Sequence, residues 1–124
     1  MAATPEQIRA TAETYIAGLN ASDPEVLAGV YAEGATVEDP VGGGTVHEGK
    51  DAIRGFYDNL APLDMQATLL ETRVCGSELL FNFELVTRFD ENTATTINVW
   101  DLMVHGEDGK VTSMKAYWGA ENVS

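Results

Sequence analysis

The stretch that decides the fold lies at residues 78–105 and reads ELLFNFELVTRF (78–89), DEN (90–92) and TATTINVWDLMVH (93–105). Apolar side chains recur at alternate positions in both long segments, and β-branched and aromatic residues are frequent there, as is typical of strands. The short polar segment between them is a turn signal. The pattern predicts two long antiparallel strands that are joined as a hairpin.

The same signals continue on both sides of this hairpin. Residues 66–75 and 110–118 also alternate, and the turn-forming stretches Gly76-Ser77 and Glu107-Asp108-Gly109 separate them from the hairpin. Helix-like segments occupy the first half of the chain. This order predicts an α+β fold in which three helices cover one face of a curved, mostly antiparallel sheet. A ligand is expected on the concave side, between helices and sheet.

The first predicted helix begins at Thr4-Pro5-Glu6-Gln7, where threonine caps the helix, proline suits its first position and glutamine completes a capping box. It is expected to run to about Asn20. The apolar residues have the spacing of one buried helical face, so Tyr15 points inward. This stripe consists of Ile8, Ala12, Tyr15, Ile16 and Leu19.

Two further helices are expected before the long strands. The first follows the start signal Ser22-Asp23-Pro24-Glu25 and ends at Gly34. Its inward stripe consists of Val26, Leu27, Val30 and Tyr31. The next helix is expected at about residues 50–60 and is stopped by Pro62. Its apolar side consists of Ile53, Phe56, Tyr57 and Leu60.

Size and charge limit the classes of function. The 124 residues (13.3 kDa) suit one domain with one core, covering residues 1–124. Seven basic against twenty acidic residues give a formal net charge of -13, which repels nucleic acid and anionic lipid. The single cysteine, Cys75, excludes an internal disulfide framework, and the first ten residues lack a signal-peptide pattern. We therefore expect a cytoplasmic protein that binds neither nucleic acid nor membranes.

The most informative residue is Asp101, because alternation places it on the same strand face as Ile97, Val99 and Met103. An ionised carboxylate without a partner is so costly to bury that the group keeps its proton instead. As a neutral acid it can donate a hydrogen bond. The sequence leaves two alternative hypotheses for this carboxyl: it has a partner such as an arginine from elsewhere in the chain, or it lies at a sheet end that is open to water.

Two more groups are expected to point inward. Tyr15 lies on the buried face of the first helix, where a tyrosine is often only a core residue with a satisfied hydroxyl. Asp39 ends a short predicted strand at residues 35–39, and Pro40 favours an extended conformation for it. Alternation places Asp39 on the face of Val37, with Glu38 opposite. A carboxylate before a Pro-Val-Gly turn can equally be a turn former.

One ionised carboxylate and two neutral donors are what proton transfer beside a carbonyl requires. The carboxylate accepts and returns the proton, and the donors stabilise the charge that develops on oxygen. This chemistry needs no metal or organic cofactor. His47 and His105 lie far apart and lack metal-binding spacing, so no metal site is expected.

With these residues the chain resembles the bacterial ketosteroid isomerases, or steroid Δ-isomerases, within the nuclear-transport-factor-like superfamily of cone-shaped α+β proteins. The likeness extends over nearly the whole chain. The residues that carry it are Tyr15, Ala35-Thr36-Val37-Glu38-Asp39-Pro40-Val41-Gly42, Phe56-Tyr57, Asp101 and Ala116-Tyr117-Trp118.

The resemblance implies an activity and roles for single residues. The double bond of a 3-oxo-Δ5-steroid would move to the conjugated Δ4 position. Asp39 would carry the proton, while Tyr15 and protonated Asp101 would donate to the dienolate oxygen. Tyr31 and Tyr57 would extend the hydrogen bonding behind Tyr15. An apolar pocket for the flat ligand would be walled by Phe56, Phe81, Phe83, Val99, Met103, Met114 and Trp118.

The resemblance also implies a homodimer that pairs through the outer face of the sheet, where Trp100, Leu102 and Val104 are too apolar for solvent. It leaves rival functions open, because one fold supports several chemistries. Another enzyme on the same scaffold is one rival: an epoxide hydrolase, a dehydratase or a polyketide cyclase. A binding protein for hydrophobic ligands, without catalysis, is the other.

Overall fold

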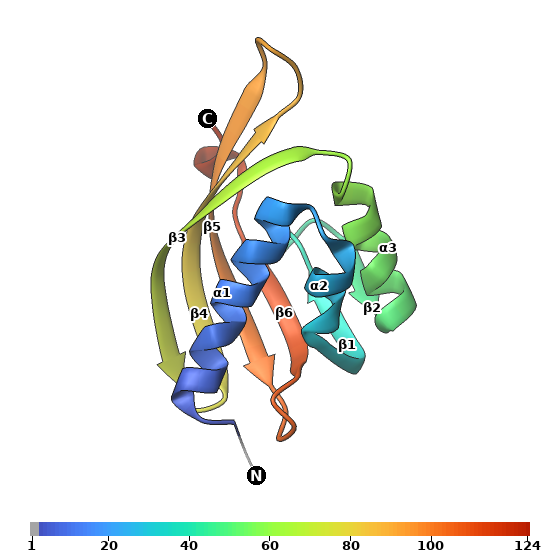
Figure 1. Ribbon diagram of the computed structural model, residues 1–124, viewed down its shortest axis with the longest axis vertical. Coiled ribbons are helices and arrows are strands. Elements are labelled where there is room, and N and C mark those ends of the chain that lie inside the picture. Colours follow the sequence, from blue (N-terminus) through green and yellow to red (C-terminus); the bar gives the residue numbers. More distant parts are fainter. Residues whose placement is uncertain (1–2) are drawn as a thin grey trace.

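Six strands form one sheet, and three helices cover one of its faces (Figure 1). The computed structural model describes residues 3–124. The helices are α1 (Pro5–Ala21), α2 (Pro24–Gly29) and α3 (Lys50–Leu60), and a 3-10 turn, η1 (Ala120–Asn122), follows the last strand. The strands are β1 (Tyr31–Glu38), β2 (Val46–Glu48), β3 (Asp64–Cys75), β4 (Glu78–Arg88), β5 (Ala94–His105) and β6 (Val111–Tyr117). The predicted α+β class is therefore confirmed.

The sheet has the order β2-β1-β6-β5-β4-β3. Each neighbouring pair is antiparallel except β1 and β6, which are parallel. The long strands β3, β4, β5 and β6 follow one another as the predicted hairpins. No helix among residues 3–124 is both long enough and apolar enough to cross a membrane.

The capping box that predicted the start of α1 is present. The Gln7 backbone N–H donates to Thr4 Oγ1 at 3.2 Å, and the Thr4 N–H donates to Gln7 Oε1 at 2.8 Å. Each bond satisfies a backbone donor that the helix itself leaves unpaired. The whole predicted stripe of α1 is buried against the sheet.

The second helix is shorter than predicted, and Tyr31 is not part of it. α2 ends at Gly29, and Tyr31 is the first residue of β1, where it pairs with Val111 of β6. The cause is the parallel pairing, since the Val111 N–H donates to the Val30 carbonyl at 2.9 Å and draws the chain into the sheet. Gly34, expected to stop the helix, has a φ of +74° at an irregularity within β1. Tyr31 is nevertheless buried, as expected.

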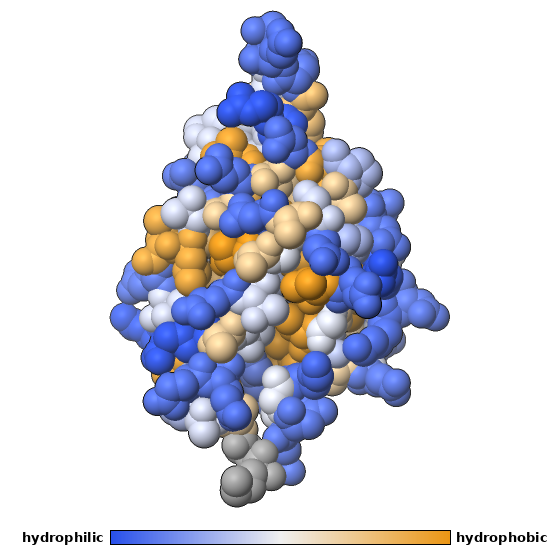
Figure 2. All heavy atoms as spheres, viewed as in Figure 1, coloured by the Kyte–Doolittle hydropathy of each residue, from blue (hydrophilic) through white to orange (hydrophobic). Residues whose placement is uncertain are grey.

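The β4–β5 hairpin extends beyond the helices at one end of the molecule (Figure 1). Its tip is covered by hydrophilic side chains in Figure 2, consistent with the polar segment at residues 90–92. Nearer the body of the protein, the two strands bury matched positions on the face that the helices cover. Phe83 lies opposite Val99, and Phe81 lies opposite Asp101. Phe81, Phe83 and Val99 all belong to the buried hydrophobic core.

The Asn20 side chain fixes α1 to the sheet. Its Nδ2 donates to the Ala67 carbonyl at 3.0 Å, and its Oδ1 accepts from the Ala67 N–H at 2.6 Å. Ala67 lies in β3, an edge strand of the sheet. The amide therefore satisfies backbone groups that an edge strand leaves unpaired, and it sets how the end of α1 lies over the sheet.

We predict that Asn20→Ala lowers the free energy of unfolding by about 1–3 kcal/mol, because two hydrogen bonds of roughly 0.5–1.5 kcal/mol each are lost. Urea denaturation followed by circular dichroism measures the change. Asn59→Ala, at an exposed position of α3, is the matched control and should change stability by less than about 0.5 kcal/mol. Equal effects of the two substitutions would contradict the role assigned to Asn20.

Candidate active site

An apolar cavity of about 280 Å³ lies between α1, α3 and the inward face of the sheet. Its volume is near the lower limit of roughly 300 Å³ for small-molecule sites, so it is large enough for a single small ligand. The lining comes from both helices, from the strands and from the residues that follow β1 and β6. The lining residues are Tyr15, Leu19, Asp39, Phe56, Leu60, Leu63, Met65, Phe83, Leu85, Thr87, Phe89, Thr95, Ile97, Val99 and Trp118.

Asp101 lies on β5, two residues beyond the cavity-lining Val99, and is only 1% exposed. Neither carboxyl oxygen has a hydrogen-bond partner among the described residues. The sequence had left two alternatives for Asp101, a charged partner and contact with water. Neither is seen within residues 3–124. Burial raises the pKa of the Asp101 carboxyl well above its ordinary value, and the negative charge of Asp39 raises it further. A carboxyl in this environment keeps its proton.

Three buried tyrosines form a hydrogen-bonded chain that begins at the cavity. The Tyr57 hydroxyl donates to the Tyr15 hydroxyl at 3.1 Å, and the Tyr31 and Tyr57 hydroxyls are 2.6 Å apart. Each phenol has one proton, so Tyr31 must donate to Tyr57 when Tyr57 donates to Tyr15. The proton of Tyr15 is then available for a ligand.

The environment of the three tyrosines keeps them neutral. Burial is the largest cause that raises the pKa of each of the three phenols well above its ordinary value. Tyr15 also packs edge-on against Phe81, with ring centroids 5.9 Å apart, and Phe81 lies opposite Asp101 in the sheet. The two donors expected from the sequence, Tyr15 and Asp101, therefore both neighbour Phe81.

Asp39 follows the last residue of β1 and lines the cavity. Its Oδ1 accepts a hydrogen bond of 2.8 Å from Trp118 Nε1, which leaves Oδ2 to face a ligand. Burial raises the pKa of Asp39 above its ordinary value, whereas the Trp118 hydrogen bond and the charge of His47 oppose this rise. Glu38 has a different environment, since its Oε2 accepts from the exposed Gly42 N–H at 3.1 Å.

The structure brings together part of the pocket wall that the sequence suggested. Phe56, Phe83, Val99 and Trp118 line the cavity. Three others are fully buried in the core and are not among its lining residues: Phe81, Met103 and Met114. Tyr31 and Tyr57 are also absent from the lining and lie behind Tyr15. Alternation identified the correct face of each strand but not how far along that face the cavity extends.

Sequence reasoning missed much of the remaining wall. Five missed residues belong to β4, β5 and the residue after β4, and they share the alternation of Phe83 and Val99: Leu85, Thr87, Phe89, Thr95 and Ile97. The pattern that predicted the strands could have found them. Leu63 lies between α3 and β3, where no periodic signal exists.

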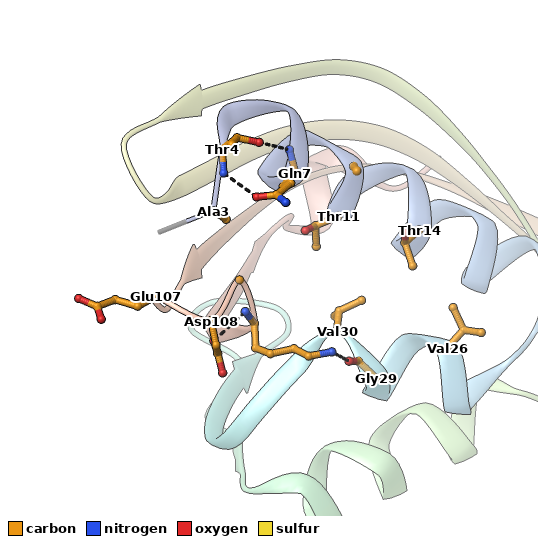
Figure 3. Close-up of a pocket in the computed structure, with 13 residues that line it drawn as sticks. Ala3, Thr4, Gln7, Thr11, Thr14, Val26, Gly29, Val30, Glu107 and Asp108 are labelled. Carbon is orange, nitrogen blue, oxygen red and sulfur yellow. Dashed lines mark hydrogen bonds between the residues drawn. The ribbon is translucent and has the colours of Figure 1, made fainter. Parts of the chain in front are cut away.

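A larger hollow of about 790 Å³ lies elsewhere, between α1, α2 and the β5–β6 turn (Figure 3). Thr11 and Thr14 of α1 face Val26 and Val30 across it, and Lys110 Nζ donates to the Gly29 carbonyl at 3.0 Å (Figure 3). Neither Asp39 nor Asp101 lines this hollow. Tyr15 and Asp39 line the smaller apolar cavity instead, which makes that cavity the candidate active site.

The two histidines lie apart. His47 packs against Phe56 with ring centroids 4.7 Å apart and the two ring planes tilted by 38°. His105 is buried, and its Nε2 lies 2.9 Å from Thr11 Oγ1. Within residues 3–124, no three His, Cys, Asp or Glu side chains are grouped as metal ligands would be.

We predict that Asp101→Asn changes the pH dependence of stability. The wild-type protein binds the Asp101 proton more tightly when folded. Its stability therefore falls as pH rises above the unfolded pKa of about 3.9, by up to about 1.4 kcal/mol per pH unit, until the folded pKa is reached. The Asn variant lacks this slope.

Denaturation of both proteins at several pH values between about 4 and 8 tests this prediction. The free energy of unfolding of the variant, relative to wild type, should rise with pH across that window. Parallel curves for the two proteins would mean that Asp101 ionises normally in the folded state. Carbon-13 NMR of the Asp101 carboxyl gives an independent measurement of its protonation.

Comparison with known proteins agrees with this architecture. The SnoaL-like domain family matches residues 12–114. A steroid Delta-isomerase from Nocardioides simplex is 32% identical over 112 residues, which cover 90% of this chain and 89% of that protein.

Two solved structures show the same fold, each with a TM-score of 0.87. One is the epoxide hydrolase/cyclase-like enzyme SalBIII, which has a role in pyran ring formation in the polyether salinomycin; it is 23% identical, with 96% of this chain and 95% of that chain covered. The other is RV0760c from Mycobacterium tuberculosis, which is 21% identical, with 98% of both chains covered. The chain belongs to the SnoaL-like domain family of the nuclear-transport-factor-like superfamily, and a steroid Delta-isomerase is among its relatives.

Proposed function

We propose that the protein is a steroid Δ-isomerase that moves the double bond of a 3-oxo-Δ5-steroid into conjugation with the ketone, forming the Δ4 product through a dienolate and without a cofactor. The observation that carries the proposal is the buried carboxyl of Asp101, which has no partner within the described chain. It lies on β5 directly beyond Val99, which lines an apolar cavity together with Tyr15 and Asp39. The steroid Delta-isomerase relative supports the same activity.

Asp39 is the proton carrier in this mechanism. Its Oδ2 removes the proton from the carbon between the ketone and the isolated double bond, and the electron pair shifts towards the ketone oxygen. The same oxygen then returns the proton two carbons further along, which regenerates the carboxylate. The Trp118 hydrogen bond to Oδ1 holds the carboxylate in place for both steps.

Tyr15 and Asp101 stabilise the negative charge that develops on the dienolate oxygen. Asp101 is not among the cavity-lining residues, and it is the next inward residue beyond Val99 on β5, about 7 Å along the strand. In the proposed mechanism the ketone oxygen lies beyond Val99, where it meets the Asp101 carboxyl. An ionised Asp101 would repel that oxygen, whereas the protonated form donates to it. Donors that are fixed in a dry site stabilise the charge without having to reorganise during the reaction.

The polar groups of the cavity favour isomerisation over the rival chemistries. A dehydratase or cyclase would need a His–Asp pair in the cavity. An enzyme that opens epoxides would need an arginine between two aspartates there. The cavity-lining residues include one aspartate and, within the described chain, neither histidine nor arginine.

A direct assay separates the isomerase from a protein that only binds hydrophobic ligands. When the protein is mixed with 5-androstene-3,17-dione, an isomerase produces the ultraviolet absorbance of the conjugated enone. Binding of the steroid without this absorbance would overturn the proposed activity.

We also propose that the protein works as a homodimer through the outer face of the sheet. Trp100, Leu102 and Val104 alternate with the inward residues of β5 and are half-buried in the monomer. A second copy that covers this face would remove their remaining apolar surface from water.

We predict that Asp39→Asn lowers kcat for this steroid by on the order of 10²–10⁴-fold or more, because the amide cannot accept the proton. In the wild-type protein, activity should fall as pH is lowered through the pKa of Asp39, which burial raises above its ordinary value. Enone absorbance measures both effects. Unchanged thermal unfolding of the variant would exclude misfolding, and near-normal turnover would exclude Asp39 as the base.

We predict that Tyr15→Phe lowers kcat by on the order of 10²–10³-fold, because one donor to the dienolate oxygen is removed. Tyr117→Phe is the matched control, since Tyr117 is exposed and lies outside the cavity. It should turn over substrate like the wild type. If both variants lost activity equally, the loss could not be assigned to the Tyr15 hydroxyl.

A further inference from the structure

The inward faces of β4 and β5 form a ladder of directly opposed pairs that runs outward from Asp101. Asp101 lies opposite Phe81, followed outward by two apolar pairs and then by a pair of threonines. The two apolar pairs are Phe83 with Val99 and Leu85 with Ile97. Thr87 and Thr95 form the fourth pair, and both line the cavity.

The threonine pair is polar although its neighbours on the inward face are apolar. The two pairs before it are entirely apolar, and Phe89, the next inward residue on the β4 side, is an exposed phenylalanine at the outer end of the cavity. Thr87 is only 6% exposed. A hydroxyl in so enclosed a place is stabilised by a polar partner, and an apolar side chain would fill the space without needing one.

The polar groups of the cavity therefore fall into two sets. Tyr15, Asp39 and the Trp118 indole belong to the end where the chemistry is proposed, and the threonine pair belongs to the outer end. The two opposed apolar pairs lie between them. A ligand that matches this pattern has a rigid apolar body with a polar atom at each end.

The spacing fits a ligand of the proposed class. Thr95 lies six positions before Asp101 along β5, which corresponds to roughly 20 Å of extended strand. Part of this length is taken up by the two side chains and by one hydrogen bond at each end of the ligand. The length that remains can hold a skeleton of several fused rings.

We propose that Thr87 and Thr95 form a second polar subsite that binds an oxygen at the far end of the substrate. This inference rests on the proposed isomerase function. It names the residues that would distinguish substrates with a keto or hydroxyl oxygen on the five-membered ring from substrates without one. Either threonine hydroxyl can donate to such an oxygen and can also accept from a ligand hydroxyl.

The subsite should act on binding and not on the chemical step. The far oxygen does not change its charge when the dienolate forms, so its hydrogen bonds are equally strong in the ground state and in the transition state. Such uniform binding lowers KM and leaves kcat unchanged. A neutral hydrogen bond of ordinary strength corresponds to an affinity change on the order of 10-fold.

The test compares two substrates in the double variant Thr87→Val/Thr95→Val. For 5-androstene-3,17-dione, KM should rise on the order of 10-fold with little change in kcat. For 5-androsten-3-one, which lacks the far oxygen, KM should stay the same or fall. Thr87→Ser/Thr95→Ser keeps both hydroxyls and should retain the preference for the diketone.

Thr96→Val is the matched control, because Thr96 neighbours Thr95 on the opposite face of β5 and does not line the cavity. It should leave KM for both substrates unchanged. Equal changes in KM for the two substrates in the double valine variant, or no change for either, would overturn the subsite. Thermal unfolding of each variant checks that the fold is retained.

Equilibrium binding separates failure of the subsite from failure of the proposed activity. Calorimetry with the Δ4 products, 4-androstene-3,17-dione and 4-androsten-3-one, requires no turnover. A selective loss of diketone binding in the valine variant supports the subsite even if the wild type forms no enone. Isomerisation of both substrates without that selective loss overturns the subsite alone, and absence of steroid binding overturns both.

Discussion

The constraint on which the site depends is the removal of the Asp101 carboxyl from water without a partner. In a low-dielectric interior an unpaired negative charge is so unfavourable that the proton stays on the oxygen. The neighbours of Asp101 across the sheet, Phe81 and Ala116, are apolar and offer it no hydrogen bond. A negative charge on Asp39 reinforces the effect. In the proposed mechanism, two side chains of identical chemistry hold opposite protonation states: Asp101 keeps its proton and Asp39 is the carboxylate.

The fold excludes water from Asp101 and holds the side chains around it in fixed positions. α1 crosses the inward face of the sheet, where Tyr15 packs edge-on against Phe81 and Phe83. The Asn20 amide fixes the end of that helix to the edge strand. The proposed donors and the proposed base therefore lie on or next to regular elements, which hold a catalytic geometry more accurately than long loops do.

Alternation in the long strands was enough to predict most of the sheet and to single out Asp101. Periodicity reports which face of an element is buried, so it worked wherever the element is long. It failed for Tyr31, because the helical stripe continues into a strand whose pairing with distant β6 leaves no local signal. β2 has only three residues, too few for a pattern, and forms by pairing with β1. The bond between Asp39 and Trp118 joins residues 79 positions apart, and periodicity contains no information on such contacts.

The chain of three phenols has a further physical meaning. Its far member, Tyr31, is as deeply enclosed as Tyr57, so the chain ends inside the protein and has no outlet to solvent. It can be polarised, each hydroxyl shifting its electron density when charge appears at Tyr15, but it cannot conduct a proton away. In the proposed mechanism, the three hydroxyls therefore form a polarisable group behind the reacting oxygen. In the proposed mechanism the travelling proton is confined to the base and the substrate, which favours its return to the molecule from which it came.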